Sequence, residues 1–190
     1  MWVSVGVHLR AFLGDPKGVA SLLPTSLATV GRIVSKAPVE EADLIVEFGP
    51  GSGVVTRGLL RRMRPEARLV AIEANEEFAE RLTAELGDRR LSVEHDAAER
   101  VGEILDARGL GPADCVFSGI PFFWLDWEQA RSIVANTEAA LAPGGVFVAY
   151  QMFYQPRRCL RDHLDACFRS VRSELDLPSF SPYRISAATK

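Results

Sequence analysis

The fold is decided by Leu44-Ile-Val-Glu-Phe-Gly-Pro-Gly-Ser-Gly53, an apolar run that ends in an acid and three alternating glycines. The apolar part predicts a buried parallel strand, and glycine allows the positive φ angles and close backbone approach of a tight loop. A helix beginning near Gly53 directs its free N–H groups toward a ligand, and Glu47 lies at the carboxyl edge of the sheet, where open α/β folds bind ligands. The stretch therefore predicts a binding site for a small molecule, and a nucleoside is the candidate ligand.

The spacing of these glycines excludes the dinucleotide fingerprint G-x-G-x-x-G/A. Its third position is Val54 when counted from Gly49 and Thr56 when counted from Gly51. The pattern is instead acid-x-G-x-G-x-G, which resembles the first motif of the class I S-adenosylmethionine-dependent methyltransferases. Because the glycine loop of that family passes beside the amino-acid part of the cofactor, the resemblance implies binding of S-adenosylmethionine. A plain strand-to-helix turn is the alternative interpretation of a lone glycine loop.

Acidic residues also follow the next two predicted strands. The strand 68–72 ends at Glu73, which lies 20 residues after Gly53 (73 − 53) and is suited to accept hydrogen bonds from ribose hydroxyls. The strand 91–95 ends at Asp96, where the class I family carries a side chain that contacts the adenine amino group. The residues expected to bind the cofactor are therefore Glu47, Gly49, Pro50, Gly51, Gly53, Glu73, Ala74, Asp96, Ala97 and Ser118.

A second informative stretch, Ser118-Gly-Ile-Pro-Phe-Phe-Trp-Leu125, follows the predicted strand 114–117. Three consecutive aromatic residues do not have helical core spacing, so we expect a loop over the site. The stretch departs from the Asn/Asp-Pro-Pro-aromatic form of nucleic-acid amino-methyltransferases. It resembles the Ser-Gly-Leu-Pro form of the bacterial phospholipid N-methyltransferases, and residues 9–26 resemble the opening of that family.

This resemblance implies methylation of the head-group amine of a phospholipid such as phosphatidylethanolamine. The residues expected to position the acceptor are Ser118, Gly119, Pro121, Phe122 and Trp124. Aromatic rings favour a methylated cation through their faces. The rings considered for this role are Phe122, Phe123, Trp124, Tyr150, Phe153 and Tyr154, with Phe122 and Trp124 preferred and Phe153 expected in the core.

Other functions stay open at the sequence level. The same motif order occurs in ribosomal RNA dimethyltransferases, so an RNA adenine N6-methyltransferase is one alternative, and a small-molecule methyltransferase is another. A non-catalytic nucleoside-binding protein is a third. The net charge of −3 gives no general attraction for nucleic acid, which makes an RNA partner the weaker expectation.

Strands and helices alternate from residue 43 onward, which is typical of a parallel sheet covered on both faces. The alternating runs 171–177 and 183–187 predict a closing antiparallel hairpin, and a turn at 141–145 leads into a strand at 146–150. The expected fold is a three-layer, Rossmann-like α/β methyltransferase sandwich with a mostly parallel seven-stranded sheet. The 190 residues fit a single methyltransferase domain, with a core at 43–190 and an N-terminal helical segment at 1–36.

The sequence predicts a cytoplasmic protein. Hydrophobic residues make up 47% and charged residues 25% of the chain, and no apolar run reaches the roughly 20 residues that span a bilayer. The three cysteines predict reduced thiols, and the scattered histidines predict no metal. Residues 1–36 carry four basic residues and one acid, so this segment is expected to contact the inner membrane face or to cover the cofactor site. A helix that packs on the domain is the alternative.

Overall fold

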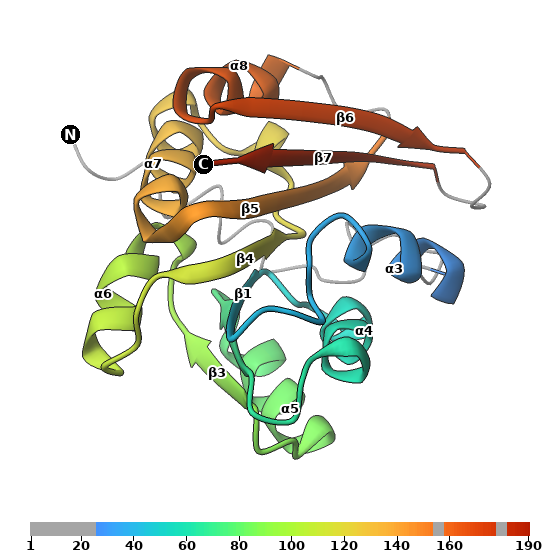
Figure 1. The fold of residues 1–190 in the computed structure, drawn as a ribbon, viewed down its shortest axis with the longest axis vertical. Coiled ribbons are helices and arrows are strands. Elements are labelled where there is room, and N and C mark those ends of the chain that lie inside the picture. Colours follow the sequence, from blue (N-terminus) through green and yellow to red (C-terminus); the bar gives the residue numbers. More distant parts are fainter. Residues whose placement is uncertain (1–25, 154–157, 178–181) are drawn as a thin grey trace.

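The computed structural model describes residues 26–153, 158–177 and 182–190, and these form one sheet with helices on both faces (Figure 1). The strands are β1 (Leu44–Phe48), β2 (Arg68–Glu73), β3 (Leu91–His95), β4 (Ala113–Ser118), β5 (Leu141–Met152), β6 (Ser170–Asp176) and β7 (Tyr183–Thr189). The α-helices are α3 (Leu27–Val34), α4 (Val54–Arg62), α5 (Glu76–Leu86), α6 (Val101–Ala107), α7 (Trp127–Ala140) and α8 (Arg158–Cys167). Two short 3₁₀ helices are η1 (Ala98–Arg100) and η2 (Phe122–Trp124).

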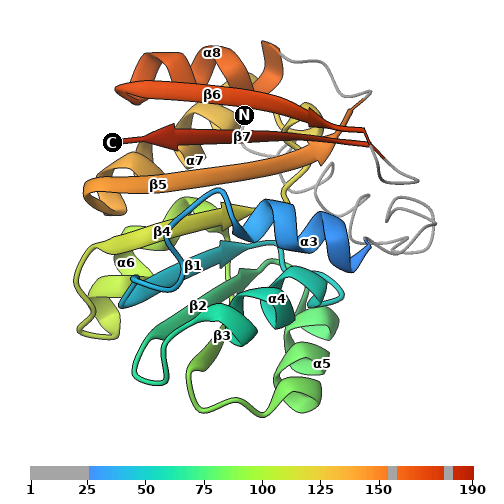
Figure 2. The same ribbon diagram turned by 45° about the vertical axis from the view of Figure 1, so that its right-hand side comes forward.

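The seven strands lie in the order β3-β2-β1-β4-β5-β7-β6. The strands β1 to β5 are parallel, whereas β7 pairs antiparallel with β5 on one side and β6 on the other. Because β7 is reversed, β6 runs in the same direction as β5. The carboxyl ends of six strands and the beginning of β7 therefore meet at one edge of the sheet, called the carboxyl edge below (Figure 2). This result confirms the expected fold class.

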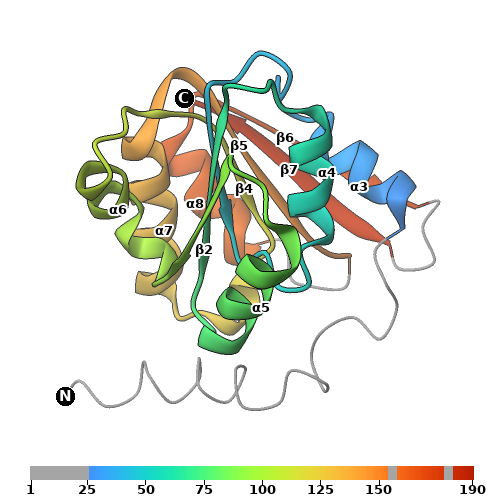
Figure 3. The same ribbon diagram turned by 90° about the horizontal axis from the view of Figure 1, so that it is seen from below.

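Two apolar clusters hold the layers together. The helices α6, α7 and α8 pack on one face of the sheet, and α3 and α4 pack on the other (Figure 3). Alternate residues of β1 contribute to the two faces, since Val46 and Phe48 lie in one cluster and Ile45 in the other. All five residues of β1 are buried, as expected for a central parallel strand.

Local sequence signals account for most element boundaries. Ser26 and Asn75 cap α3 and α5 by accepting hydrogen bonds from backbone N–H groups, and Asp126 with Gln129 forms a capping box at α7. The structure differs from the prediction of a turn at 141–145 before the strand, because β5 already begins at Leu141. Its pairing with β4 shifts between Ala113 and Cys115, and Gly144 has a φ of 79°, so the turn is an irregularity within a longer strand.

An ion pair with a buried carboxylate joins α3 to the hairpin of β6 and β7. Arg32 of α3 approaches Asp176 of β6 with Nε 2.5 Å and Nη2 2.9 Å from its carboxylate oxygens, and the Asp176 side chain is almost fully buried. Arg32 itself is partly exposed. The pair joins the last turn of α3 to the end of β6.

The proposed behaviour of the N-terminal segment lies largely outside the described residues, which begin at Ser26. Within the ranges that the structure describes, no helix has the length and apolar character needed to cross a bilayer. The same ranges hold no group of three or more His, Cys, Asp or Glu side chains arranged to bind a metal ion.

Candidate functional site

The glycine loop between β1 and α4 has the backbone conformation that its sequence predicts. Gly49, Gly51 and Gly53 have φ angles of 61°, 52° and 71°, in the left-handed region that favours glycine. The three positions differ in their surroundings. A Cβ atom at Gly51 would meet nothing within 4 Å, whereas one at Gly53 would lie 2.4 Å from Leu82 Cδ1. Gly51 therefore borders open space, and Gly53 allows α5 to pack against the loop.

Glu73 lies at the end of β2 with its carboxylate against this loop. Its Oε2 accepts a hydrogen bond from Gly51 N at 3.1 Å, and its Oε1 accepts one from Asn75 N at 3.0 Å. Burial raises the pKa of this carboxyl, and the backbone donors partly offset the effect. A carboxylate has about four acceptor positions, so Glu73 can accept further hydrogen bonds from a ligand beside Gly51.

Glu47 lies at the end of β1 and has no exposed surface. Both of its carboxylate oxygens lack hydrogen-bond partners. Burial raises the pKa of Glu47 to about 7, while the nearby Thr56 hydroxyl lowers it and the charge of Glu73 raises it further. The Thr56 hydroxyl is also buried without a partner, so the two side chains lie close without forming a well-aligned hydrogen bond.

The remaining predicted cofactor residues lie around the same loops. Asp96 follows β3, and its carboxylate accepts hydrogen bonds of 2.7 Å from Ala97 N and from Arg100 Nη1. The carbonyl oxygen of Pro50 accepts a hydrogen bond from Gly53 N at 2.9 Å. Ala74 and Ala97 directly follow Glu73 and Asp96 and are half-buried. The structure therefore brings the predicted residues to the carboxyl ends of four adjacent strands.

The second loop begins where β4 ends and runs beside the glycine loop. Gly119 N donates to the carbonyl oxygen of Phe48 at 3.0 Å, and the Ser118 hydroxyl accepts from Ile120 N at 3.3 Å. A Cβ atom at Gly49 would lie 3.4 Å from Ile120 Cγ1. The two loops are thus in contact, with Pro121 half-buried beyond them.

The expected roles of the aromatic residues need one correction. Phe122 is 0% exposed and belongs to the core cluster under α7 and α8, so its ring makes no surface available to an acceptor. The three aromatic residues form the short helix η2 rather than an open loop, which turns the first ring inward. Trp124 is 50% exposed, and its ring centroid lies 4.8 Å from that of half-buried Phe123. Phe153 is 47% exposed rather than in the core, and Tyr154 lies outside the described residues.

Two features of the site are not evident from the motifs. Thr56 has no recognisable signal, because its approach to Glu47 depends on how α4 packs on the sheet. The position of Tyr150 depends on the strand order, which places β5 beside β4. A Cβ atom at Gly119 would lie 2.8 Å from the Tyr150 hydroxyl, so this tyrosine closes the site from the β5 side.

Several solved structures with the same fold are methyltransferases. The O-methyltransferase from Bacillus cereus, solved in complex with S-adenosylhomocysteine, matches with a TM-score of 0.73 at 16% identity, covering 98% of this chain and 90% of that one. At this identity the match shows the fold alone. By sequence, residues 25–98 match the family model described as ribosomal RNA adenine dimethylase, a segment that contains the glycine loop, Glu73 and Asp96.

Two curated relatives extend this result. The ribosomal RNA small subunit methyltransferase A of Leifsonia xyli subsp. xyli is 42% identical over 87 residues, which are 43% of this chain but only 30% of that protein. The ornithine lipid N-methyltransferase of Singulisphaera acidiphila is 30% identical over 157 residues, which cover 78% of this chain and 82% of that protein. The similarity thus extends over most of both chains and includes both loops of the site. The protein belongs to the class I S-adenosylmethionine-dependent methyltransferases.

Proposed function

We propose that this enzyme transfers a methyl group from S-adenosylmethionine to the head-group amine of a membrane lipid, such as phosphatidylethanolamine. The observation that carries this proposal is the distribution of exposed apolar side chains. Among the described residues, six large apolar side chains are 47% to 72% exposed, namely Leu27, Trp124, Trp127, Phe153, Leu175 and Leu177.

All six lie at the carboxyl edge. Trp124 and Trp127 follow the end of β4, Phe153 follows β5, and the two leucines lie at the end of β6. Leu27 begins α3, which starts at the same edge (Figure 2). Exposed apolar groups gathered in this way mark an interaction surface. Since Trp is the side chain that proteins favour at membrane interfaces, we propose that this edge rests on the bilayer.

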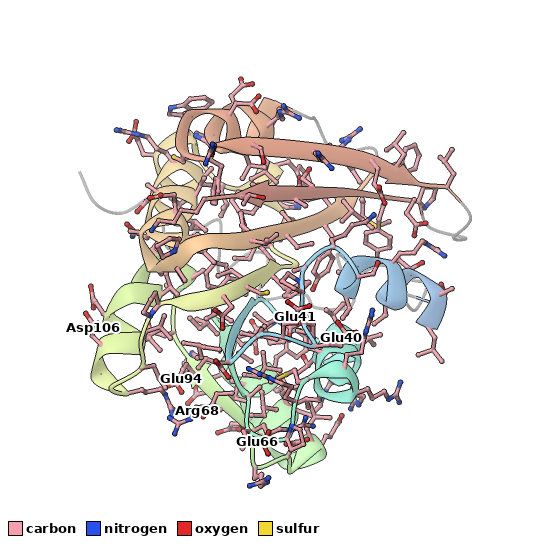
Figure 4. All side chains as sticks on the ribbon, in the orientation of Figure 1. Glu40, Glu41, Glu66, Arg68, Glu94 and Asp106 are labelled. Carbon is pink, nitrogen blue, oxygen red and sulfur yellow. The ribbon has the colours of Figure 1, made fainter. Side chains whose placement is uncertain are left out.

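The opposite edge of the sheet has a different character. The loops and element ends there carry Glu40, Glu41, Glu66, Arg68 and Asp106, which are labelled in Figure 4. Charged side chains are costly to bury in lipid, so this edge is suited to face water. The contrast between the two edges supports one orientation, in which the cofactor site opens toward the lipid head groups.

Sequence similarity supports a lipid acceptor independently. The relative from Singulisphaera acidiphila is by name an N-methyltransferase of ornithine lipid, and its similarity covers most of this chain. Of the four basic residues in 1–36, Arg32 and Lys36 form ion pairs with Asp176 and Glu174 of β6. The other two, Arg10 and Lys17, suit an anionic surface, where each Lys or Arg contributes about 1 kcal/mol. We propose that the whole chain forms one methyltransferase domain acting at the inner membrane face, with residues 1–36 helping to dock it.

The site has the features that S-adenosylmethionine requires. The open space at Gly51 is the space that a side chain would fill, and Glu73 offers carboxylate lone pairs next to it. We propose that Glu73 binds the ribose hydroxyls and that Asp96 with Ala97 borders the adenine. The rest of the cofactor-binding site is formed in this proposal by Glu47, Gly49, Pro50, Gly51, Gly53, Ala74 and Ser118. When bound, the cofactor supplies an electrophilic methyl group on a sulfonium.

The acceptor is then expected on the other side of the site. Ser118, Gly119 and Pro121 form the loop that contacts the glycine loop, and Trp124 and Phe123 lie beyond it. We propose that the Trp124 ring attracts the cationic head group through its π face, a contact that contributes about 0.5–2 kcal/mol. The loop aligns the amine and excludes water, which is most of what direct methyl transfer requires of a protein.

Replacing Glu73 by alanine is expected to weaken binding of S-adenosylhomocysteine by about 1–3 kcal/mol, because the ribose hydroxyls lose a charged acceptor. Isothermal titration calorimetry measures this change directly. Glu76→Ala, an acid in the first turn of α5, is the matched control and is expected to bind normally. Equal affinities of wild type and Glu73→Ala would remove the ribose assignment.

Replacing Trp124 and Trp127 together by alanine is expected to weaken binding to phosphatidylethanolamine and phosphatidylglycerol vesicles by about tenfold or more, because apolar area is lost from the interface. Sedimentation with vesicles at increasing salt measures this binding. Arg68→Ala, at the charged edge, is expected to sediment like the wild type. Binding is also expected to fall with salt and on deletion of residues 1–14. Unchanged sedimentation of the double variant would overturn this docking surface.

An RNA acceptor is the second candidate, because residues 25–98 match the ribosomal RNA adenine dimethylase family. That match covers the part of the chain that holds most of the proposed cofactor-binding residues, and it ends before the second loop. The deciding experiment incubates the protein and methyl-labelled cofactor with vesicles containing phosphatidylethanolamine or ornithine lipid, and separately with total RNA. Label in the lipid amine supports the proposal, whereas label in RNA alone overturns it.

A further inference from the structure

The Tyr150 side chain occupies a junction that neither motif includes. Tyr150 lies near the end of β5, on the same sheet face as Val148 and Glu47. Its hydroxyl lies over the backbone of Gly119, where a Cβ atom would be 2.8 Å from the hydroxyl and 3.1 Å from the ring carbon that bears it. The same Cβ position is 3.1 Å from the carbonyl oxygen of Gly49. The phenol therefore ends where the glycine loop and the second loop meet.

This position explains why residue 119 is a glycine. Its conformation does not demand one, since Gly119 is not among the residues with a positive φ. Its requirement is spatial, because a Cβ atom would collide with the Tyr150 hydroxyl at 2.8 Å and make a tight contact with the Gly49 carbonyl oxygen at 3.1 Å. Gly119 thus leaves room for a phenol that reaches across the end of β4.

The surroundings keep the phenol neutral. Burial raises the pKa of Tyr150 well above its usual value, and the charges of Glu47, Tyr183 and Glu73 act in the same direction. No hydrogen bond joins its hydroxyl to any residue that the structure describes. A neutral hydroxyl with unused donor and acceptor capacity therefore lies between the proposed cofactor-binding site and the second loop, where the acceptor is proposed to bind.

We propose that the Tyr150 hydroxyl positions the acceptor amine by accepting a hydrogen bond from its N–H, so that the nitrogen lone pair faces the methyl donor. This inference rests on the proposed methylation of an amine. The head-group ammonium first releases a proton to water, which frees the nitrogen lone pair. In the step itself, this lone pair bonds to the methyl carbon while the carbon–sulfur bond breaks, and the electron pair of that bond stays on sulfur, which leaves as the thioether of S-adenosylhomocysteine. The amine becomes an N-methylammonium, which later releases its proton to water. The phenol keeps its own proton throughout and acts only on orientation.

The kinetic test uses Tyr150→Phe, which removes one oxygen and keeps the ring. With phosphatidylethanolamine vesicles, kcat is expected to fall about tenfold, which corresponds to the loss of one hydrogen bond, while the KM for the cofactor changes less than about twofold. Tyr183→Phe, which removes a phenol oxygen from the neighbouring strand, is the matched control and is expected to keep wild-type kcat. A Tyr150→Phe variant with wild-type kcat would overturn the proposal.

A double-mutant cycle connects Gly119 to the same role. Gly119→Ala is expected to lower kcat about tenfold or more in the wild type, because its methyl group displaces the phenol. In the Tyr150→Phe background the same substitution is expected to cost less, since no hydroxyl remains to be displaced. Additive losses would mean that Gly119 acts independently of Tyr150, and would overturn this part of the proposal.

A binding readout separates this proposal from the proposed function. The chain has three tyrosines, so ¹³C labelling at the phenol carbon gives three resonances, and Tyr150→Phe identifies one of them. With S-adenosylhomocysteine bound, adding phosphoethanolamine is expected to shift the Tyr150 resonance. A shift with the cofactor product alone, and no further change with the amine, would assign Tyr150 to the cofactor and overturn the proposal. The resonance decides this point even if no lipid accepts the methyl group.

Discussion

Replacing Phe122 by alanine is expected to lower the free energy of unfolding by about 3–5 kcal/mol, the usual cost of deleting a buried phenylalanine ring. The ring has no exposed surface and packs in the core cluster with residues of α7 and α8. Its removal would leave a cavity that the surrounding helices fill only in part. Urea unfolding followed by circular dichroism measures the change.

The neighbouring Trp124→Ala variant is the matched control. Trp124 is half exposed, so its removal is expected to change the free energy of unfolding by less than about 0.5 kcal/mol while lowering methyl transfer. Phe122→Leu keeps most of the buried volume and should recover much of the lost stability. If Phe122→Ala were as stable as the wild type yet inactive with the cofactor bound, the ring would belong to the acceptor site after all.

Replacing Glu47 by glutamine is expected to remove a pH dependence of stability worth about 3 kcal/mol. Burial raises the pKa of Glu47 from 4.5 to about 7, so the folded protein holds this proton more tightly than the unfolded chain. Unfolding between these pH values therefore releases a proton. The contribution of Glu47 to stability is favourable at low pH and declines as pH rises through this window.

The measurement is the difference in unfolding free energy between wild type and Glu47→Gln at several pH values. From pH 5 to pH 8 the wild type is expected to lose most of the 3 kcal/mol relative to the variant, so the variant gains in relative stability as the solution becomes more basic. Glu41→Gln, an exposed acid before β1, should show no such trend. Parallel curves for wild type and Glu47→Gln would mean that Glu47 is paired in the folded protein.

The relative gain in stability of the Glu47→Gln variant is expected to come with a loss of function. A buried carboxylate without partners is unfavourable for the fold, and proteins retain such groups mainly where a ligand or reaction needs them. Calorimetry with S-adenosylhomocysteine checks this consequence in the same variant.

Much of the fold is predictable from the sequence because its signals are local. Serine, asparagine and aspartate mark the starts of α3, α5 and α7, and the glycine loop predicts the transition from β1 to α4. The acids at the ends of β1 and β2 follow from counting residues along each strand. Parallel pairing then brings them to one edge without any further information.

The remaining features depend on contacts between distant segments. The inward rotation of Phe122 follows from the 3₁₀ geometry of η2 and its packing on α8, which three adjacent aromatic residues do not reveal. The contact between Tyr150 and Gly119 requires β5 to lie beside β4. The alternating patterns of β6 and β7 predict a hairpin, but they do not indicate which of the two strands pairs with β5.

The place of β7 between β5 and β6 has a consequence for biosynthesis. The ribosome completes β6 before β7, yet β6 has no partner in the sheet until β7 is available. A nascent chain can pair β1 to β5, but it then presents two strands with open edges, β5 and β6. Such edges attract other chains, so we expect the emerging protein to depend on chaperones until residues 183–189 leave the exit tunnel. The insertion of this single strand then pairs the open edge of β5 and one edge of β6 at once.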